Sequence, residues 1–400
     1  MVEHPTDPVG ELERDAGEGH GKMAVRNSLL SATRRRRRRA LLVAGAVTTV
    51  VGGLGLAVNA SIGLARDDSA VRGTTKSSSS WEFAPQAPLS PRQAETVVHV
   101  GEQLVVWGGN LPERPEVRND GAYYDINERR WDRLPASPIV GRTQAVGIAN
   151  GRRVAVVGGF NEGREELQSG AIVSLDAGVW DVLPDSPIGG HLVGAWNQSG
   201  LLVASAGQHT MAVFDPGTNT WREPVVTDEP IAAAFRRDDE SLEVVTVSHK
   251  PGESLVHWWR YDVGMNDLVP IDSFTILGEW AGDVIDVAAS PSGGLVLATQ
   301  SGRVFVNERQ VGELTVCSGW LSLHASASNV LVRECDGAMH WLAGDDLRPL
   351  PNAPLGPGTP ALIGGGPEWA VALSLGYPKG TPSYEDGIPA FTAVWALTTP

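Results

Sequence analysis

Histidine and tyrosine are the side chains of this 400-residue chain that could carry metal or redox chemistry, and their spacing does not gather them into a site. The histidines beyond residue 90 are scattered, with no pair or triplet at a metal-ligand spacing. They are His99, His191, His209, His249, His257, His324 and His340. No Gly-x-Ser-x-Gly elbow and no phosphate-binding glycine loop occurs in the sequence. We therefore predict no catalytic residue, no metal site and no bound cofactor.

Two cysteines, Cys317 and Cys335, are the only ones in the chain. An even pair of cysteines in an exported protein suggests a disulfide. Closing the loop between Cys317 and Cys335 would contribute about 3 kcal/mol to stability in the chain-entropy model. We expect this bond, with two buried free thiols as the alternative.

Long polar loops are a second place for chemistry, in this case reversible binding. They are the segments Asn110–Asp120, Phe160–Gly170 and Tyr377–Pro389. Loops long enough to cost ordering entropy often carry function. Their candidate binding residues are Glu113, Arg114, Arg118, Arg164, Glu165, Tyr384 and Asp386. We expect a partner site there, with ordinary solvated loops as the alternative.

The elements that must position these loops belong to a repeated unit. A hydrophobic strand ends in a double glycine, and then come a loop, an aromatic-Asp pair, a short turn and a Trp. The pattern is clearest over Leu104–Trp131, recurs over Arg153–Trp180, and a third copy ends at Trp221. Its repeated positions are Gly108, Gly109, Gly158 and Gly159, then Trp81, Trp131, Trp180 and Trp221. A period of this size indicates stacked copies of one supersecondary unit.

The repeat predicts a closed ring of β-sheets. Leu268 stands where Trp would, because YDVGMNDL has the spacing of FDPGTNTW. The stretch Ser80–Arg92 looks like the end of a repeat, whereas the C-terminal stretch lacks its outer strand. We therefore expect the N-terminal strand to complete the C-terminal sheet, since an open ring leaves unpaired edges. At about 46 residues for each unit the prediction is seven blades, with six or eight as alternatives.

A ring of this kind sorts the connections onto two faces. In a four-stranded blade the first–second and third–fourth turns share one face, and these are tight here. The second–third and between-blade connections share the other face, where the three long loops fall. Because those loops belong to blades one, two and seven, which are neighbours in a closed ring, we expect one raised patch.

The pattern resembles the kelch-repeat family within the wider galactose oxidase-like propeller group. The matching residues are the two double glycines, then Tyr124, Phe214 and Tyr261, and the tryptophans at 131, 180 and 221. The resemblance is strong over Trp81–Pro270 and faint over Thr275–Pro400. It implies an all-β, seven-bladed propeller.

The chemistry of that propeller group does not accompany the resemblance. A galactose oxidase-like copper site would need two Tyr, two His and a Cys joined to one Tyr, and nothing pairs Cys317 or Cys335 with such a set. The stretch Ser174–Trp180 is similar to a sialidase Asp-box, but its Trp comes one residue early. We expect neither activity.

A membrane segment is predicted near the N-terminus. The run Arg34–Arg39 precedes the uncharged stretch Ala40–Val58, which at 1.5 Å per residue spans roughly 28 Å, close to a bilayer core. Arginines stay in the cytoplasm, so we expect a disordered basic cytoplasmic tail over 1–39, a transmembrane helix over 40–65, a flexible linker over 66–80 and an extracytoplasmic propeller over 81–400. A signal peptide cleaved near Val58–Ala60, or a twin-arginine signal, is the alternative.

Charge sets limits on the partners. The first 66 residues hold 10 basic and 6 acidic side chains, whereas the rest hold 22 basic and 41 acidic ones. An acidic body repels nucleic acid, which we exclude as a partner. Arginine far outnumbers lysine, which suggests a GC-rich, bacterial source. We expect a non-catalytic module of the bacterial membrane that binds a protein or cell-wall glycan; the alternatives are an exported carbohydrate-active enzyme or oxidoreductase, and a sensor.

Overall fold

The computed structural model describes most of the chain beyond residue 80. The described residues are 81–83, 85, 87–90, 92–111, 114–277, 284–314, 322–325, 330–334, 338–350, 362–365, 369–374 and 391–396. The predicted tail, transmembrane helix and linker, over 1–80, lie outside them. Among the residues that the structure describes, no helix is long and apolar enough to cross a membrane.

The described residues are strands and connections, and the strands pair into seven antiparallel sheets. Each sheet is called a blade here. Blade 1 consists of β2 (Thr96–Val100), β3 (Gln103–Trp107), β4 (Gly121–Asp125) and β5 (Arg130–Arg133). Blade 2 consists of β6 (Val146–Asn150), β7 (Arg153–Val157), β8 (Gly170–Ser174) and β9 (Val179–Leu183). Blade 3 consists of β10 (Leu192–Asn197), β11 (Gly200–Ser205), β12 (Thr210–Asp215), β13 (Thr220–Trp221) and β14 (Val225–Val226).

The remaining blades continue in chain order. Blade 4 consists of β15 (Ile231–Arg236), β16 (Leu242–Lys250), β17 (Glu253–Asp262) and β18 (Asp267–Leu277), and blade 5 of β19 (Val284–Ala289), β20 (Leu295–Thr299), β21 (Arg303–Val306) and β22 (Arg309–Glu313). Blade 6 consists of β23 (Ser322–Ala325), β24 (Val330–Arg333), β25 (Met339–Ala343) and β26 (Asp346–Pro349). Blade 7 consists of β27 (Leu362–Gly365), β28 (Trp369–Ser374), β29 (Phe391–Ala396) and β1 (Trp81–Phe83).

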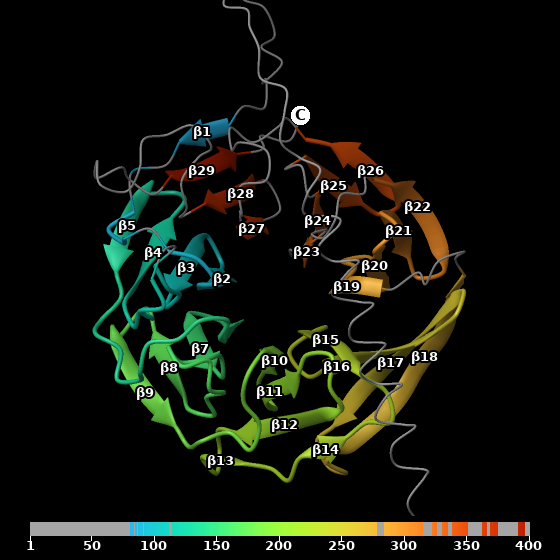
Figure 1. Cartoon of the computed structure of the whole chain (residues 1–400), viewed down its shortest axis with the longest axis horizontal. Helices are drawn as coiled ribbons and strands as arrows, with labels where there is room; N and C mark the ends of the chain where they lie inside the picture. Colours follow the sequence, from blue (N-terminus) through green and yellow to red (C-terminus); the bar gives the residue numbers. More distant parts are fainter. Residues whose placement is uncertain are drawn as a thin grey trace, which may run out of the picture. The chain divides into compact units, whose positions relative to one another are not determined.

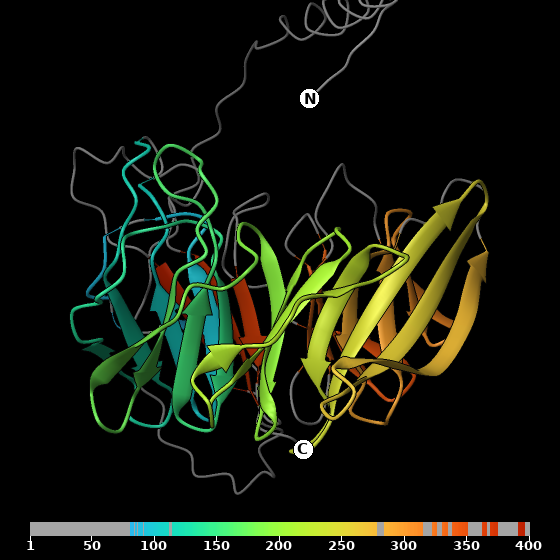
Figure 2. The same cartoon turned by 90° about the horizontal axis from the view of Figure 1, so that it is seen from below.

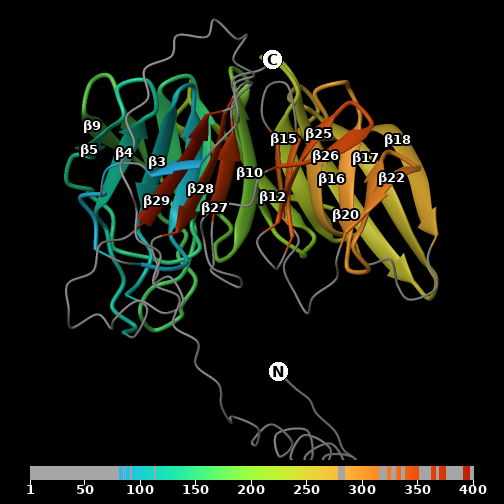
Figure 3. The same ribbon diagram turned by 90° about the horizontal axis from the view of Figure 1, so that it is seen from above.

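The blades form a β-propeller. The first strand of each blade lies innermost and contacts the first strand of the next, in the order β2, β6, β10, β15, β19, β23, β27 and back to β2. Figure 1 shows the ring of sheets face-on, and Figure 3 shows the sheets standing side by side. Blades 2 to 5 therefore bury both of their faces against neighbours, as a propeller requires.

The ring closes by pairing the two ends of the described chain. β1 runs antiparallel to β29, with Trp81 opposite Trp395, Glu82 opposite Val394 and Phe83 opposite Ala393. The sequence-based expectation that the N-terminal strand completes the C-terminal sheet is confirmed. Closure gives β29 a partner on its outer edge, which would otherwise be an unpaired row of backbone groups.

A tryptophan ties each of the first blades to the blade before it. The indole Nε1 atoms of Trp131, Trp180 and Trp221 donate hydrogen bonds to the carbonyls of Pro85, Pro135 and Pro184, at 2.9, 3.0 and 2.8 Å. Within the blade, each Trp faces the aromatic or apolar residue on the third strand, as Trp131 faces Tyr124 at a ring distance of 5.2 Å. The repeated Trp is therefore a joint between blades.

Leu268 occupies the corresponding place in blade 4. It lies opposite Tyr261, as Trp221 lies opposite Phe214. The sequence alignment of Leu268 with the repeated Trp is thus confirmed.

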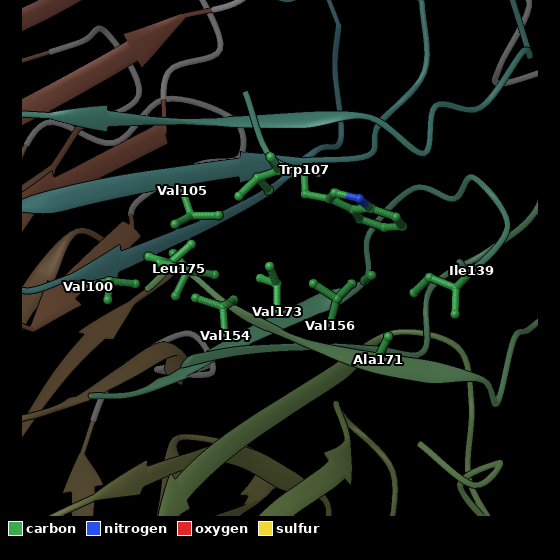
Figure 4. Close-up of a cluster of buried hydrophobic side chains, with 12 residues drawn as sticks. Val100, Val105, Trp107, Ile139, Val154, Val156, Ala171, Val173 and Leu175 are labelled. Carbon is green, nitrogen blue, oxygen red and sulfur yellow. The ribbon is translucent and has the colours of Figure 1, made fainter. Parts of the chain in front are cut away.

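The core lies between the blades rather than within them. Between blades 1 and 2, Val105 and Trp107 of β3 pack against Val154 and Val156 of β7, all at most 1% exposed (Figure 4). Burial of such a side chain contributes about 1.5–3 kcal/mol. Since both blades supply the contacts, neither could bury them alone.

Closure of the ring can be tested by weakening β1 in the full chain. Replacing Trp81, Glu82 and Phe83 by glycine removes the side chains and raises the entropy of that strand. We expect the thermal midpoint to fall by at least about 2–4 °C in a calorimetric scan. The matched control replaces Ser77, Ser78 and Ser79 by glycine; equal midpoints for the two variants would show that β1 does not secure the ring.

Candidate functional site

The second–third and between-blade connections meet on one side of the ring, called here the long-loop face. In Figure 2 the loops of blades 1 and 2, in teal and green, rise on the same side as the ends of the long yellow strands of blade 4. The loops in question join β3 to β4 and β7 to β8. This face carries the described part of the predicted partner site.

The two long loops have the same internal construction. In blade 1, Asn110 forms isolated bridges with Gln93 and with Val117. In blade 2, Phe160 forms the matching bridges with Thr143 and Glu166. Each loop is therefore a short, hydrogen-bonded ribbon that continues the blade, so its shape is fixed before any partner binds.

The double glycines permit this construction. Gly109 and Gly159 have φ of 87° and 83°, a region that favours glycine. Their N–H groups donate to the carbonyls of Arg142 and Gly190 in the next blade, at 2.8 and 2.7 Å. A Cβ on Gly159 would lie 2.5 Å from the carbonyl oxygen of Thr143, so no larger residue fits.

Two buried arginines hold the bases of the loops. Nη1 of Arg92 donates to the carbonyl of Gly108 at 3.1 Å and to Oδ1 of Asp120 at 3.1 Å. Nη1 of Arg142 donates to the carbonyls of Gly158 and Ser169, at 2.9 and 2.7 Å. Each side chain thus joins the first residue of its loop to the last.

Burial has an electrostatic effect on Arg142. It lowers the pKa of Arg142 to about 10, although the charge of Asp185 acts in the opposite direction. His191, which occupies the repeat position of Arg92 and Arg142 in the sequence, is exposed in the third blade. Blade 3 has only a short connection there, between Ser205 and Thr210, so it needs no such tie.

The predicted binding residues divide into two kinds. Arg114 and Arg164 are exposed at the loop tips and form no ion pair with another described residue. Arg118 instead pairs with Glu116 at 3.0 Å, and the carboxylate of Glu165 accepts from Asn161 at 2.8 Å. The first pair can therefore meet a partner, whereas the second pair shapes the loops.

The other predicted site residues cannot be placed. Glu113, Tyr384 and Asp386, and with them the loop of blade 7, lie outside the described residues. The predicted disulfide pair Cys317 and Cys335 lies outside them as well.

Blade 4 supplies a part of this face that the sequence reasoning missed. Its strands β16, β17 and β18 are 9, 10 and 11 residues long, whereas their counterparts β3, β4 and β5 in blade 1 have 5, 5 and 4. The β16–β17 turn falls at Pro251-Gly252, a dipeptide typical of turns. That dipeptide between two alternating runs was the available signal for a long hairpin.

A polar cluster lies where this hairpin meets the connection from blade 3. The carboxylate of Glu229 binds Nδ1 of His257 at 2.5 Å and accepts from the hydroxyls of Thr246 and Ser248, at 2.9 and 3.2 Å. Burial raises the pKa of Glu229, but the hydrogen bonds from His257 and Thr246 outweigh it, so the net pKa is lowered. The carboxylate thus orients the imidazole of His257 through Nδ1, and that side chain is 28% exposed.

A second carboxyl group at the long-loop face is perturbed by burial. Glu95 lies two residues after the bridge residue Gln93. A Cβ placed on Gly109 would lie 3.0 Å from the Cβ of Glu95. Burial raises the pKa of Glu95 to about 7. A hydrogen bond from its own backbone N–H and the positive charge of Arg92 both lower the pKa, but burial has the larger effect. The equivalent residue of blade 2 is Ala145, so this carboxyl is not a structural feature of the repeat.

The inner strands place further ionisable groups near the centre of the ring. The rings of His99 on β2 and His324 on β23 are 6.5 Å apart, from blades on either side of blade 7. Burial, and then the neighbouring His99, lowers the pKa of His324 to about 4. Burial raises the pKa of Asp286 to about 6. Among the described residues no three His, Cys, Asp or Glu side chains are grouped so as to hold a metal ion.

Comparison with known proteins gives a local likeness. No protein-family model matches the chain. A 76-residue stretch is 30% identical to the N-(sulfonatooxy)prop-2-enimidothioate sulfolyase of Thlaspi arvense. The match covers 18% of this chain and spans 22% of the length of that relative.

The arginine at the loop base is open to a direct test. Arg142→Leu would leave the carbonyls of Gly158 and Ser169 buried without donors, and we expect a loss of about 2–4 kcal/mol in the free energy of unfolding by urea. The control is Arg152→Leu, which removes an exposed pair with Asp176 and should change stability by less than about 0.5 kcal/mol. Equal losses for both variants would contradict the assigned role of Arg142.

The Glu229 cluster predicts a pH dependence. Because the folded-state pKa of Glu229 lies below its ordinary value of 4.5, its stabilisation is present above pH 4.5 and is lost as the pH falls below it. Glu229→Gln should lower stability at pH 7 by roughly 1–3 kcal/mol and flatten this acid-dependent part of the stability curve. Glu253→Gln, at a partly exposed position paired with Lys250, is the control and should leave the curve unchanged.

Proposed function

We propose that this chain is a membrane-anchored, extracytoplasmic propeller of seven blades, similar to the kelch family, that binds a protein or a cell-wall glycan without catalysis. The observation that carries the proposal is the matched pair of hydrogen-bonded loops in blades 1 and 2, which project from one face and end in exposed arginines. A rigid ring that presents ordered loops loses little entropy on binding. Arginine is a frequent anchor of protein interfaces.

The placement outside the cytoplasm rests on the sequence. Six consecutive arginines precede an uncharged stretch of membrane-spanning length, which orients the segments after residue 66 outward. The acidic body that follows suits a soluble domain at the cell surface. The seven described sheets and the pairing of β1 with β29 support the blade count.

A second candidate function is enzymatic: an exported carbohydrate-active enzyme or oxidoreductase of propeller type. The Glu229–His257 pair favours it, because a carboxylate that orients one imidazole nitrogen leaves the other for proton transfer. The named activity of the Thlaspi arvense protein is that of a lyase, but the local match does not carry its substrate to this chain. In this candidate, His257→Gln would abolish turnover and leave partner capture intact.

Charge reversal at the loop tips tests the binding function. In the variant Arg114→Glu/Arg164→Glu, the two exposed anchors become repulsive to an acidic or hydrogen-bond-accepting partner. We expect the yield of cross-linked partner from intact cells to fall at least about tenfold, as for loss of two interface anchors. Mass spectrometry of the cross-linked material supplies the measurement.

The control for this experiment reverses two arginines on the opposite face. Arg129 and Arg152 lie in the β4–β5 and β6–β7 turns, so Arg129→Glu/Arg152→Glu makes the same change in net charge away from the loops. Partner capture should survive in the control. Equal capture by both variants would count against a site on the long-loop face.

A further inference from the structure

Blade 4 carries a stretch of sheet that extends past the neighbouring blade. On the side toward blade 3, the shared hydrophobic core reaches Trp259 of β17 but does not include Leu255 of the same strand. The strands β11 and β12 of blade 3 have six residues each, and only a short connection joins Ser205 to Thr210. The far half of the β16–β17–β18 sheet therefore has no blade packed against this side.

The side chains on this stretch stand in two rows across three strands. The rows are Ser248, Leu255 and Thr275, and then Thr246, His257 and Ser273. On β18 the residues Ser273 and Thr275 are exposed, whereas the alternate residues Phe274 and Ile276 are buried in the core shared with blade 5. Thr246 is buried beneath the others. The remaining members, which are Ser248, Leu255, His257, Ser273 and Thr275, are called the hydroxyl face here.

The hydroxyl face is polar but uncharged. Three of its five members carry hydroxyl groups, one is the imidazole of His257, and one, Leu255, is apolar. Lys250 and Glu253 lie beside it at the hairpin turn, where they pair with each other at 3.5 Å. Side chains on one face of a sheet are about 7 Å apart along a strand and about 5 Å apart across strands, so the face measures about 7 Å by 10 Å. That is roughly the area of one or two sugar rings.

The imidazole of His257 is held ready to accept a hydrogen bond. Its Nδ1 lies 2.5 Å from the carboxylate of Glu229, and the ring of Trp259 supports it at 5.7 Å between ring centres. A neutral imidazole that donates through Nδ1 accepts through Nε2. The carboxylate of Glu229 is itself fixed by the hydroxyls of Thr246 and Ser248. The orientation of His257 is therefore set before a ligand arrives, which lowers the entropic cost of binding.

This chemistry selects a class of ligand. The aromatic and arginine side chains that anchor protein interfaces are missing from the hydroxyl face. An anionic polymer would find no lysine or arginine there and would be repelled by the acidic body of the chain. Sugar hydroxyls both donate and accept hydrogen bonds, as do the hydroxyls of Ser273 and Thr275, and they can donate to His257. An uncharged sugar polymer is thus the complementary ligand.

We propose that the hydroxyl face is a binding site for an uncharged glycan strand. Sugar hydroxyls donate to Nε2 of His257 and exchange hydrogen bonds with Ser273 and Thr275, while Leu255 packs against an apolar edge of a sugar ring. The assignment of this site rests on the proposed binding function and adds a ligand class to it. It places the glycan on blade 4, apart from Arg114 and Arg164 in the loops of blades 1 and 2.

The test titrates an uncharged hexasaccharide of N-acetylglucosamine into the full chain in a calorimeter. The chain is purified in a mild detergent without a sugar headgroup, which would compete for the site. We expect saturable binding with a dissociation constant below about 1 mM. The variant Ser273→Ala/Thr275→Val removes two exposed hydroxyls with little change in shape, so the fold should be unaffected. Loss of their hydrogen bonds should raise the dissociation constant at least about fivefold.

The matched control removes two hydroxyls elsewhere. Thr218 and Thr220 are exposed at the β12–β13 turn of blade 3, so Thr218→Val/Thr220→Val makes a similar change away from the hydroxyl face. This control should bind the hexasaccharide as tightly as the wild-type chain does. The proposal is overturned by a wild-type chain that shows no saturable binding, or by equal weakening in the two variants.

A further comparison separates the glycan site from the binding function of the loops. Arg114→Glu/Arg164→Glu should bind the hexasaccharide normally, because its changes lie in other blades. A chain that captures a partner through these arginines but binds no hexasaccharide would keep the proposed function and lose the glycan site. A protein that the wild-type chain captures and Ser273→Ala/Thr275→Val does not would show that a protein occupies the hydroxyl face, which also overturns the proposal.

Discussion

The packing of one sheet face on the next is the interaction on which the whole structure depends. The strands β3 and β7 are buried throughout except for Arg153, so these sheets have no face that suits water. A four-stranded sheet that is apolar on both sides is stable only between two neighbours, so these sheets require the ring in order to fold. The β1–β29 ladder is then the contact that turns a row of sheets into a closed set. Its three residue pairs join parts of the chain that are more than 300 residues apart in sequence.

The fixed geometry of the ring also explains how the loops are held. Each loop of blades 1 and 2 is tied to the next blade through a glycine N–H and to its own base through a buried arginine. These contacts use backbone carbonyls, which every residue supplies, so the sequence of the loop tips can vary without loss of the support. Arg114 and Arg164 thus stand on a framework that does not depend on them, which is the arrangement expected of binding residues on a scaffold.

Much of the architecture could be predicted because it is encoded locally and repeated. The Gly-Gly, aromatic-Asp and Trp positions follow from one blade to the next, and even the substituted Leu268 could be aligned from turn spacing alone. The ionic contacts could not be predicted, because they join residues whose separation in sequence carries no information. Glu229 and His257 are 28 residues apart and meet only because the connection into β15 lies over β16 and β17. A scattered histidine in the sequence therefore became part of a cluster in space.

Blade 4 shows why strand length is harder to infer than strand existence. Hydrophobic alternation continues through β17 whether or not its neighbours extend to meet it, so the pattern fixes the face but not the point at which pairing stops. Here pairing continues to Leu277, beyond the height at which the adjacent blade 3 ends its six-residue strands. The extension places Thr246, Ser248 and His257 where they meet the carboxylate of Glu229. A propeller with blades of equal length would lack this cluster, so the departure from the repeat in blade 4 gives this chain an ionic contact that the repeat itself does not encode.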